Sequence, residues 1–318
     1  MKLLKSLLLA LLLAVPAAAQ VNDTYVIPAA ANVPGAFGTR WMTQFSIFNP
    51  QTEYDLVVSV VYQPTGGGTG IEELVRVPAN SVAYSDNILG DLFEINGSGA
   101  LFIATFPEDN PGVPDQTLAR AFLVTSNTFN NSRTGTYGQT IPGVWAGLQD
   151  YDVDNISAIA HGIRNISSLG WRTNIGAVNL GRCTATMLVN VYDVNGKTIL
   201  NRASFTVPPL GHMQDRLPVQ VDRGSIEFFI DDPCANDANR AAVVFPYSST
   251  IDELSGDPTY QTPTLLASAK TLFGKKGIDP LALGRRIDTA TARLVRENVT
   301  RLGFAALVVD GNGYRIVK

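Results

Sequence analysis

Short runs of apolar residues, partly alternating with polar ones, dominate the chain between residues 21 and 260. The run Trp41–Phe48 places most of its large apolar side chains on one face, and Leu56–Tyr62 and Met187–Tyr192 are rich in β-branched residues. Such runs, bounded by Gly, Pro, Asn and Asp, are typical of β-strands. They recur roughly every 10–15 residues with no sustained helical period between them, which favours antiparallel sandwiches over alternating strands and helices.

The strand pattern repeats within the chain. Residues 41–78 recur at 171–208 with a constant offset of 130, so that Trp41 returns as Trp171 and Asn49 as Asn179. Later apolar blocks match at offsets of 125 and 120, with the length changes between blocks. A repeat unit of this length can hold its own core. We therefore expect a duplication that gives two tandem antiparallel β-sandwiches, the first with its linker over 21–150 and the second over 151–262.

The segment 263–318 differs from the body in pattern and in charge. Its periodicity predicts helices at 265–273, 280–287 and 289–302, followed by a hairpin with strands at 304–309 and 314–317. Residues 265–318 carry ten Lys and Arg against four Asp and Glu, a net +6, whereas residues 21–264 carry twelve against twenty-four, a net −12. We expect a small basic α+β unit that folds separately and contacts either an acidic partner or the acidic body.

The first twenty residues have the three regions of a secretory signal peptide. Lys2 and Lys5 precede the apolar run Ser6–Val15, and the small residues Ala17–Ala19 fit a cleavage site. An apolar run of about ten residues is shorter than the ~20 that a membrane-spanning helix needs. The mature protein is therefore expected to be secreted or periplasmic, without a transmembrane segment after cleavage.

Both cysteines, Cys183 and Cys234, lie in the second repeat. In an oxidising compartment two cysteines pair most simply with each other, so we expect a disulfide that staples the second sandwich. The chain offers only His161 and His212 as further soft ligands, so a zinc site at these thiols is not expected.

Two acidic loops are candidates for a calcium or an acidic site: Asp150, Asp152 and Asp154 at the junction of the repeats, and Asp231 and Asp232 near Cys234. The first has D-x-D-x-D spacing, but Asn155 and His161 stand where an EF-hand loop needs Gly and Glu. A looser calcium site stays open, beside the simpler interpretation of solvated acidic turns. No other cofactor is indicated.

Aromatic residues offer a second kind of candidate site. Trp145 has no counterpart in the repeat and lies in the linker, so it is the candidate ligand-facing or interdomain aromatic. Trp41 and Trp171 occupy the same repeat position among apolar neighbours, which favours core or domain-edge anchors over sugar-stacking platforms.

No catalytic residue is assigned from the sequence. The chain has no G-x-S-x-G nucleophile motif, phosphate loop or dinucleotide fingerprint, and a Ser/His/Asp site would have to use His161 or His212. Paired carboxylates for glycoside hydrolysis stay possible, because their separation is spatial.

Two resemblances bear on the fold. The paired W-x-T-x-[FI]…N blocks, the V-x-V-Y strands and the segment 247–258 resemble uncharacterised secreted bacterial proteins with tandem immunoglobulin-like sandwiches, which implies a fold and a location but no activity. The C-terminal helix and hairpin resemble a winged helix, which implies nucleic-acid contacts by Arg293, Arg296 and Arg301. A signal peptide argues against nucleic acid as the natural partner.

These observations predict a mainly β protein that is exported and non-enzymatic. We expect it to bind, adhere or space modules at the cell envelope or exterior, with an envelope protein or a polysaccharide as the partner. The alternative is a carbohydrate-binding module or a glycoside-active enzyme that uses the acidic loops near 150–155 and 231–237.

Overall fold

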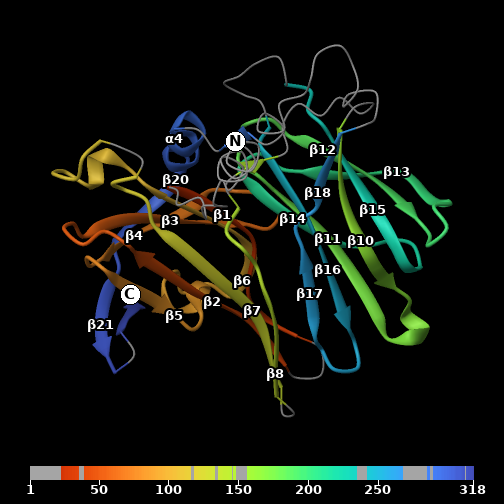
Figure 1. Cartoon of the computed structure of the whole chain (residues 1–318), viewed down its shortest axis with the longest axis horizontal. Helices are drawn as coiled ribbons and strands as arrows, with labels where there is room; N and C mark the ends of the chain where they lie inside the picture. Colours follow the sequence, from red (N-terminus) through yellow and green to blue (C-terminus); the bar gives the residue numbers. More distant parts are fainter. Residues whose placement is uncertain are drawn as a thin grey trace, which may run out of the picture.

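The structure is a computed structural model. It describes residues 23–35, 39–115, 118–132, 135–144, 146–147, 156–234, 242–267, 285–286, 289–311 and 313–318. The predicted signal peptide, Trp145 and the acidic loop with Asp150, Asp152 and Asp154 lie outside these residues. The protein is mainly β, as predicted, and its strands form two neighbouring halves (Figure 1).

Over the residues that the structure describes, the first half is built on one continuous sheet of eleven strands, which includes strands of the C-terminal segment and folds back on itself into two layers. One layer has the strand order β4-β3-β6-β1 and the other β5-β2-β7-β8, and a short β1–β2 pairing joins the layers into one continuous sheet. Its core lies between the layers and includes Val60, Phe45 and Leu101, all at 0–1 % exposure. Its elements are β1 Thr24–Pro34, β2 Arg40–Asn49, β3 Leu56–Pro64, β4 Gly70–Val77, β5 Ser81–Ser85, α2 Ile88–Asp91, β6 Gly97–Thr105, the 3-10 turn η2 Pro107–Asp109, β7 Leu123–Ser132 and β8 Gly135–Thr140.

The second half repeats this order in two sheets, β13-β12-β15-β10-β18 and β14-β11-β16-β17. Its separate core includes Met187, Ile175 and Phe228. The predicted disulfide between Cys183 and Cys234 is present. The elements are β10 Ile156–Asn165, the 3-10 turn η3 Ser167–Leu169, β11 Trp171–Asn179, β12 Ala185–Tyr192, β13 Thr198–Val207, β14 Gly211–Arg216, β15 Val221–Asp231, β16 Val244–Asp252, β17 Pro258–Gln261 and β18 Thr264–Ala267.

Corresponding residues of the two repeats make corresponding contacts. Thr43 of β2 pairs across the strand with Thr128, and their hydroxyls lie 2.8 Å apart; Thr173 and Thr250 do the same in the second half at 2.9 Å. Trp41 and Trp171 each stand two residues before these threonines. The offset of 130 therefore relates positions that are equivalent in the two halves.

The C-terminal segment does not form a separate unit, which corrects the prediction for 263–318. β18 extends the second half by pairing with β10, whereas β20 (Val299–Phe304) pairs in parallel with β4, and β22 (Gly313–Val317) with β5. In Figure 1 the dark-blue strands near the C-terminus, unlike β18, lie with the orange strands of the first half. Backbone hydrogen bonds to both outer edges of the first sandwich make the segment part of that sandwich.

Local predictions for this segment are partly right. The hairpin of β21 (Ala306–Asp310) and β22 is confirmed, and α4 spans Thr289–Glu297, the first nine residues of the predicted 289–302 helix. Residues 265–267 are strand where a helix was expected, and so are Arg285–Arg286, which form β19 and pair with β9 (Ala146–Gly147). The rest of the two upstream helix predictions falls outside the described residues.

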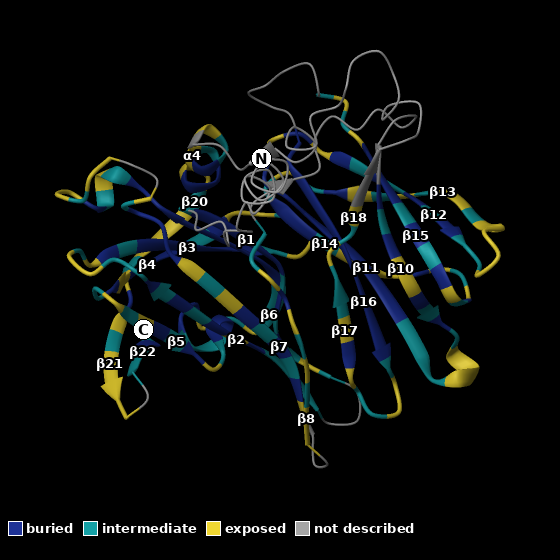
Figure 2. Cartoon of the chain, viewed as in Figure 1, coloured by how far each residue is buried: buried dark blue, intermediate teal, exposed yellow. Residues whose placement is uncertain are grey.

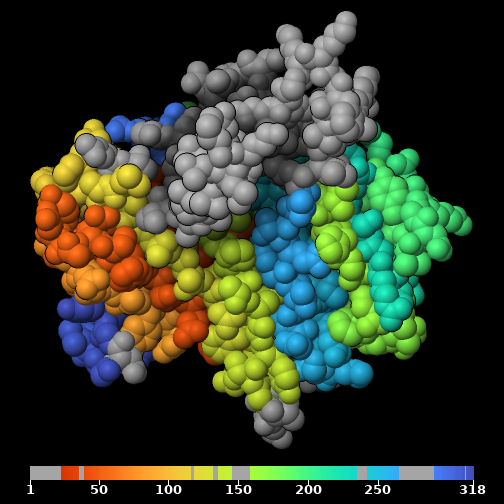
Figure 3. Space-filling view, viewed as in Figure 1, coloured from red at the N-terminus to blue at the C-terminus, as the bar shows by residue number. Residues whose placement is uncertain are grey.

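A third apolar cluster holds the halves together. Val61 and Phe102 on the outer face of the first sandwich pack against Val178 and Phe245 of the second, and α4 adds Val295. The dark-blue buried strands in the middle of Figure 2 mark this contact. In the space-filling view the yellow-green β8 also lies against the blue β17 (Figure 3). None of the helices in the described ranges is both long and apolar enough to cross a membrane.

Candidate functional site

The contact between the halves changes character along the outer face of the β14-β11-β16 sheet. Side chains alternate across a strand, so one face of β11 carries Arg172, Asn174, Gly176 and Val178. At the Val178 end this face joins the apolar cluster between the halves. Towards Arg172 the face becomes polar, and the halves no longer pack closely.

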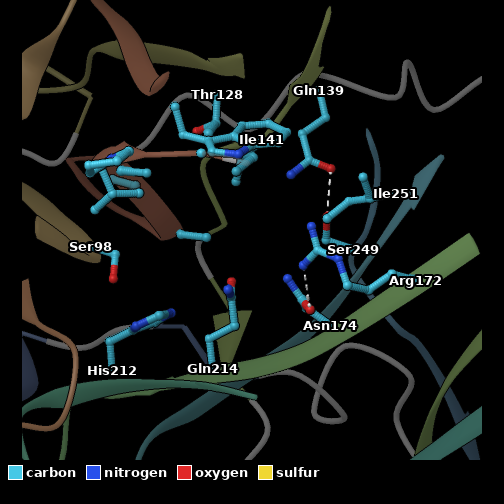
Figure 4. Close-up of a pocket in the computed structure, with 17 residues that line it drawn as sticks. Ser98, Thr128, Gln139, Ile141, Arg172, Asn174, His212, Gln214, Ser249 and Ile251 are labelled. Atoms are coloured by element: carbon cyan, nitrogen blue, oxygen red, sulfur yellow. Dashed lines mark hydrogen bonds between the residues drawn. The ribbon is translucent and has the colours of Figure 1, made fainter. Parts of the chain in front are cut away.

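A cavity of about 320 Å³ lies at this polar end of the contact. Both halves line it, and Figure 4 shows polar side chains from either side pointing towards the opening. The first half contributes Ala29–Ala31, Val33–Gly35, Trp41, Ser98, Thr128, Gln139 and Ile141; the second contributes Arg172, Asn174, His212, Gln214, Ser249 and Ile251. The volume is at the lower end of the range of about 300–1,000 Å³ for small-molecule sites.

His212 lies at the base of the cavity in a chain of hydrogen bonds that crosses between the halves. Its Nδ1 lies 2.8 Å from the hydroxyl of Thr65, and its Nε2 lies 2.8 Å from the hydroxyl of Tyr247. Tyr247 donates to Oε1 of Gln214 at 2.9 Å, so Nε2–H of His212 donates to Tyr247. The hydroxyl of Thr65 is shared between Nδ1 of His212 and the carbonyl oxygen of Ser98, each 2.8 Å away. Burial lowers the pKa of His212 to about 3, so the ring is neutral at physiological pH.

The stacking around Tyr247 depends on a glycine. The ring stacks between His212 and Tyr260, with centroid distances of 6.0 and 5.4 Å. A Cβ on Gly176 would lie 2.3 Å from Cζ of Tyr247, so only glycine leaves room for this ring. Burial also raises the pKa of Tyr247, which keeps its hydroxyl protonated as a donor.

Three amide side chains are oriented by hydrogen bonds to their oxygens. Gln139 Oε1 accepts from the Ser249 hydroxyl at 3.0 Å, and Asn174 Oδ1 accepts from Nη1 of Arg172 at 3.2 Å. The oxygen of Gln214 accepts a hydrogen bond from Tyr247, so all three amide oxygens of the lining already accept from protein groups. Among the described residues, no hydrogen bond is donated by the three amide NH₂ groups.

Arg172 is the cation of the lining. Its Nε lies 3.3 Å from Oε1 of Glu253, and its side chain is 30 % exposed. Burial lowers the pKa of Arg172 and the Glu253 carboxylate raises it, but a guanidinium stays charged in proteins. None of the described lining residues is a carboxylic acid. The cavity therefore offers neutral donors and one partly compensated positive charge.

A second hollow, of about 430 Å³, lies on the outer face of the first sandwich. It is lined by residues of one half, among them Gln44, Ser46, Tyr84 and Thr125. The hydroxyls of Ser46 and Thr125 satisfy each other at 2.8 Å, and Gln44 donates to Asp86 at 3.2 Å. Tyr84 also donates to Asp310, so these four side chains are already paired, and the cavity between the halves is the better candidate.

The acidic residues predicted for a site have other positions and roles where the structure describes them. Asp232 accepts from the backbone N–H groups of Cys234 and Ala242, both at 2.8 Å, and so ties down the loop after β15. Asp231 is exposed at the end of β15. Asp232 also lies near both sulfurs, but these are bonded to each other and supply no thiolate for a metal. Neither aspartate lines the cavity.

The two equivalent tryptophans have different surroundings. Trp41 is half-buried and lines the cavity at the boundary of the halves. Trp171 is half-buried under the guanidinium of Arg164, 4.4 Å from the ring centroid. Both side chains fit the predicted position at a domain edge. Of the two, Trp41 alone lines the cavity and can contact a ligand there.

Sequence reasoning missed most of the lining. Gln139, Asn174, Gln214 and Ser249 were not singled out, and His212, which was considered as a candidate only for a Ser/His/Asp site or a zinc site, is buried in β14. The available signal was the change from apolar to polar residues along alternate positions of β11 and β16. That signal does not reveal which face a second domain covers.

Comparisons with known proteins leave the site unassigned. No family model matches the chain, and no curated protein matches it. Among solved structures, the chain is similar to "Recombinant peptide: N-glycanase F (PNGase F)" at 12 % identity and a TM-score of 0.22, covering 77 % of this chain and 99 % of that chain. A TM-score this low supports neither a shared fold nor a shared activity, and it bears on neither resemblance drawn from the sequence.

Proposed function

We propose that the protein is an exported, non-enzymatic binding protein of the bacterial cell envelope or exterior, and that it takes a small polar ligand in the cavity between its halves. The observation that carries the proposal is the lining itself. It combines oriented amide groups, hydroxyls and an indole, which are groups that recognise a ligand by hydrogen bonding and contact.

The same lining argues against catalysis. General acid–base chemistry needs a group that changes protonation near the working pH and reaches the substrate. His212 is held neutral, and both of its ring nitrogens are engaged by Thr65 and Tyr247. The described lining has no carboxylate to serve as a second group, so a two-carboxylate glycosidase site is not favoured in this cavity.

Export is proposed on two grounds: the basic and apolar start of the sequence, and the Cys183–Cys234 disulfide, which persists in an oxidising compartment. The partner that the protein serves, an envelope protein or a polysaccharide, would be sought by capture from envelope fractions with the purified protein as bait.

We include a duplicated immunoglobulin-like sandwich in the proposal. In both halves the second strand pairs with the fifth and the third with the sixth, which are the B–E and C–F pairs of immunoglobulin domains. The first and seventh strands differ. Here the first strand pairs along most of its length with the sixth, and the seventh pairs with the second, whereas in immunoglobulin domains the first lies beside the second and the seventh beside the sixth. The likeness therefore lies in the four central strands.

The duplication supplies a matched control for the binding test. Thermal unfolding of the protein would be followed with a panel of small polar solutes, and NMR would establish whether a stabilising solute is recovered unchanged. Trp41→Ala is expected to abolish the stabilisation by a ligand, whereas Trp171→Ala, the same change at the equivalent position outside the cavity, is expected to keep it. Equal loss in both variants, or chemical conversion of the solute, contradicts the proposal.

A further inference from the structure

We infer that the cavity between the halves selects a small hydroxylated monocarboxylate, of the size and chemistry of a hexuronic acid. The inference rests on the proposed binding function and names the ligand class of that same site. It follows from the orientation of the amides, the charge of the lining and the remaining groups around the opening.

Amide side chains can donate and accept, but here their roles are divided. The oxygens of Gln139, Gln214 and Asn174 already accept from protein groups, at 3.0, 2.9 and 3.2 Å. Their NH₂ groups are left as the donors that a ligand can use, and donors need oxygen acceptors. An ionised carboxylate has two oxygens that only accept hydrogen bonds, so it matches such a lining better than a neutral amide or amine would.

The charge of the lining favours one negative charge over two. Arg172 is the one positively charged side chain among the described lining residues, and its ion pair with Glu253 at 3.3 Å neutralises part of that charge. A buried charge is costly unless it is paired, so a dianionic phosphate ester would carry charge that this lining does not balance. A carboxylate balances the single guanidinium and can accept hydrogen bonds from it and from the amides.

The rest of the lining suits hydroxyl groups and a compact ring. The hydroxyls of Ser98, Ser249 and Thr128 are already bonded to Thr65, Gln139 and Thr43, but their oxygens keep lone pairs that can accept from a ligand hydroxyl. Trp41 presents an apolar aromatic surface. The alanines at 29–31 contribute only methyl groups, which leaves space in the first half's wall. Gln214 is exposed, so the cavity is in contact with solvent. A sugar ring offers hydroxyls at its edge and C–H groups on its faces, which suits these two kinds of wall.

Isothermal titration calorimetry of the purified protein tests the inference with three probes. D-glucuronate carries the carboxylate and the hydroxyls, D-glucose lacks the carboxylate, and acetate lacks the hydroxyls. We expect glucuronate to bind at least tenfold more tightly than either of the others. Arg172→Gln is expected to remove this preference, and Arg76→Gln, the same change at an exposed ion pair with Asp55 outside the lining, is expected to keep it.

A second variant keeps the test valid if Arg172→Gln fails to fold. Gln214→Glu changes an exposed side chain, retains an acceptor for Tyr247 and replaces a donor with a negative charge. It is expected to weaken glucuronate at least tenfold and to change glucose binding less than twofold. Equal affinities for glucuronate and glucose in the wild type would overturn the carboxylate inference while leaving the proposed binding function intact. Absence of binding for all three probes, or equal losses in Arg172→Gln and Arg76→Gln, also overturns it.

Discussion

Arg296→Met should loosen the C-terminal segment from the first sandwich more than any comparable change on α4. Arg296 is 7 % exposed, and its Nε lies 2.9 Å from Oε1 of Glu72, which is fully buried. Its Nη2 lies 2.5 Å from Asp109, and its guanidinium lies 4.3 Å from the ring centroid of Phe106. Methionine keeps much of the side-chain volume and removes the charge.

The expected loss follows from what remains after the substitution. Removing one partner of a buried ion pair costs about 3–5 kcal/mol because the other charge is left uncompensated. Glu72 keeps a hydrogen bond from Ser59 at 2.6 Å and an ion pair with Arg301 at 2.6 Å. Methionine can also contact Phe106 through its sulfur. We therefore expect the lower end, about 3 kcal/mol.

Urea and thermal unfolding would measure this loss. A change of 1 kcal/mol shifts Tm by about 2–4 °C in a domain of 150–250 residues, so we expect a decrease of roughly 6–12 °C. Arg293→Met is the matched control on the same helix, because Arg293 is 54 % exposed and lies 3.7 Å from Glu108. A surface pair of this kind contributes about 0–1 kcal/mol.

The reasoning is refuted if Arg296→Met lowers the unfolding free energy by less than about 1 kcal/mol, or by no more than Arg293→Met does. A double-mutant cycle with Glu72→Gln separates the pair from its surroundings. Coupled neighbours show interaction energies of about 0.5–3 kcal/mol, so a coupling near zero would mean that the two side chains stabilise the protein independently.

Three further predictions concern the second half. Burial lowers the pKa of His212 to about 3, below its usual value near 6.5, so between these pH values the unfolded chain binds a proton that the folded protein does not. Above pH ~6.5 the free energy of unfolding should not depend on this group. As the pH falls below that value, the free energy of unfolding should decrease by up to about 1.4 kcal/mol per pH unit, and His212→Gln should remove this slope in urea unfolding. Gly176→Ala should destabilise by about 1–3 kcal/mol through overpacking and weaken ligand binding, measured by thermal unfolding and calorimetry. Cys183→Ser with Cys234→Ser should cost about 2–4 kcal/mol in the same unfolding assay.

Each of these has a control within the chain. His161 is exposed, so His161→Gln should keep the wild-type pH slope, and an equal slope in His212→Gln would contradict the burial argument. Gly311→Ala meets no atom within 4 Å and should be neutral, so equal effects of the two glycine changes would rule out a clash as the cause. Reduction of the wild type should reproduce the loss caused by the two serines, and no loss in either case would contradict the disulfide prediction.

The strands and the disulfide could be predicted because their signals are local or have few alternatives. Short β-branched runs between turn residues gave β2, β3 and β12 close to their observed bounds. Two cysteines allow only one intramolecular pairing.

Partners distant in sequence could not be predicted. The local pattern indicated the start of α4, but the apolar residues after Glu297 continue as β20, whose Val299 pairs with Gly70 more than 200 residues away. The excess of basic residues had two possible meanings, an acidic partner or contact with the acidic body. The structure shows the second in the ion pairs that Arg296 and Arg301 make with Glu72.

The candidate site was missed for a related physical reason. A polar residue on the outer face of a strand is the normal pattern for a surface exposed to water, so Asn174 and Gln214 gave no distinctive signal. They became cavity residues because the first half covers part of that face. Trp145 and the 150–155 loop, which attracted attention in the sequence, lie outside the described residues, and Asp231 and Asp232 lie outside the cavity.

Unequal use of two equivalent faces explains why the cavity exists. Gly176 and His212 of the second half correspond to Ser46 and Val82 of the first, at the same offset of 130. Val82 is 41 % exposed, whereas His212 is 1 % exposed and bonded to Thr65 across the contact between the halves. The halves thus meet through different surfaces, as in a heterologous interface between two copies of one domain. Since one wall comes from each half, neither copy alone can form the cavity, and a binding function located there belongs to the tandem.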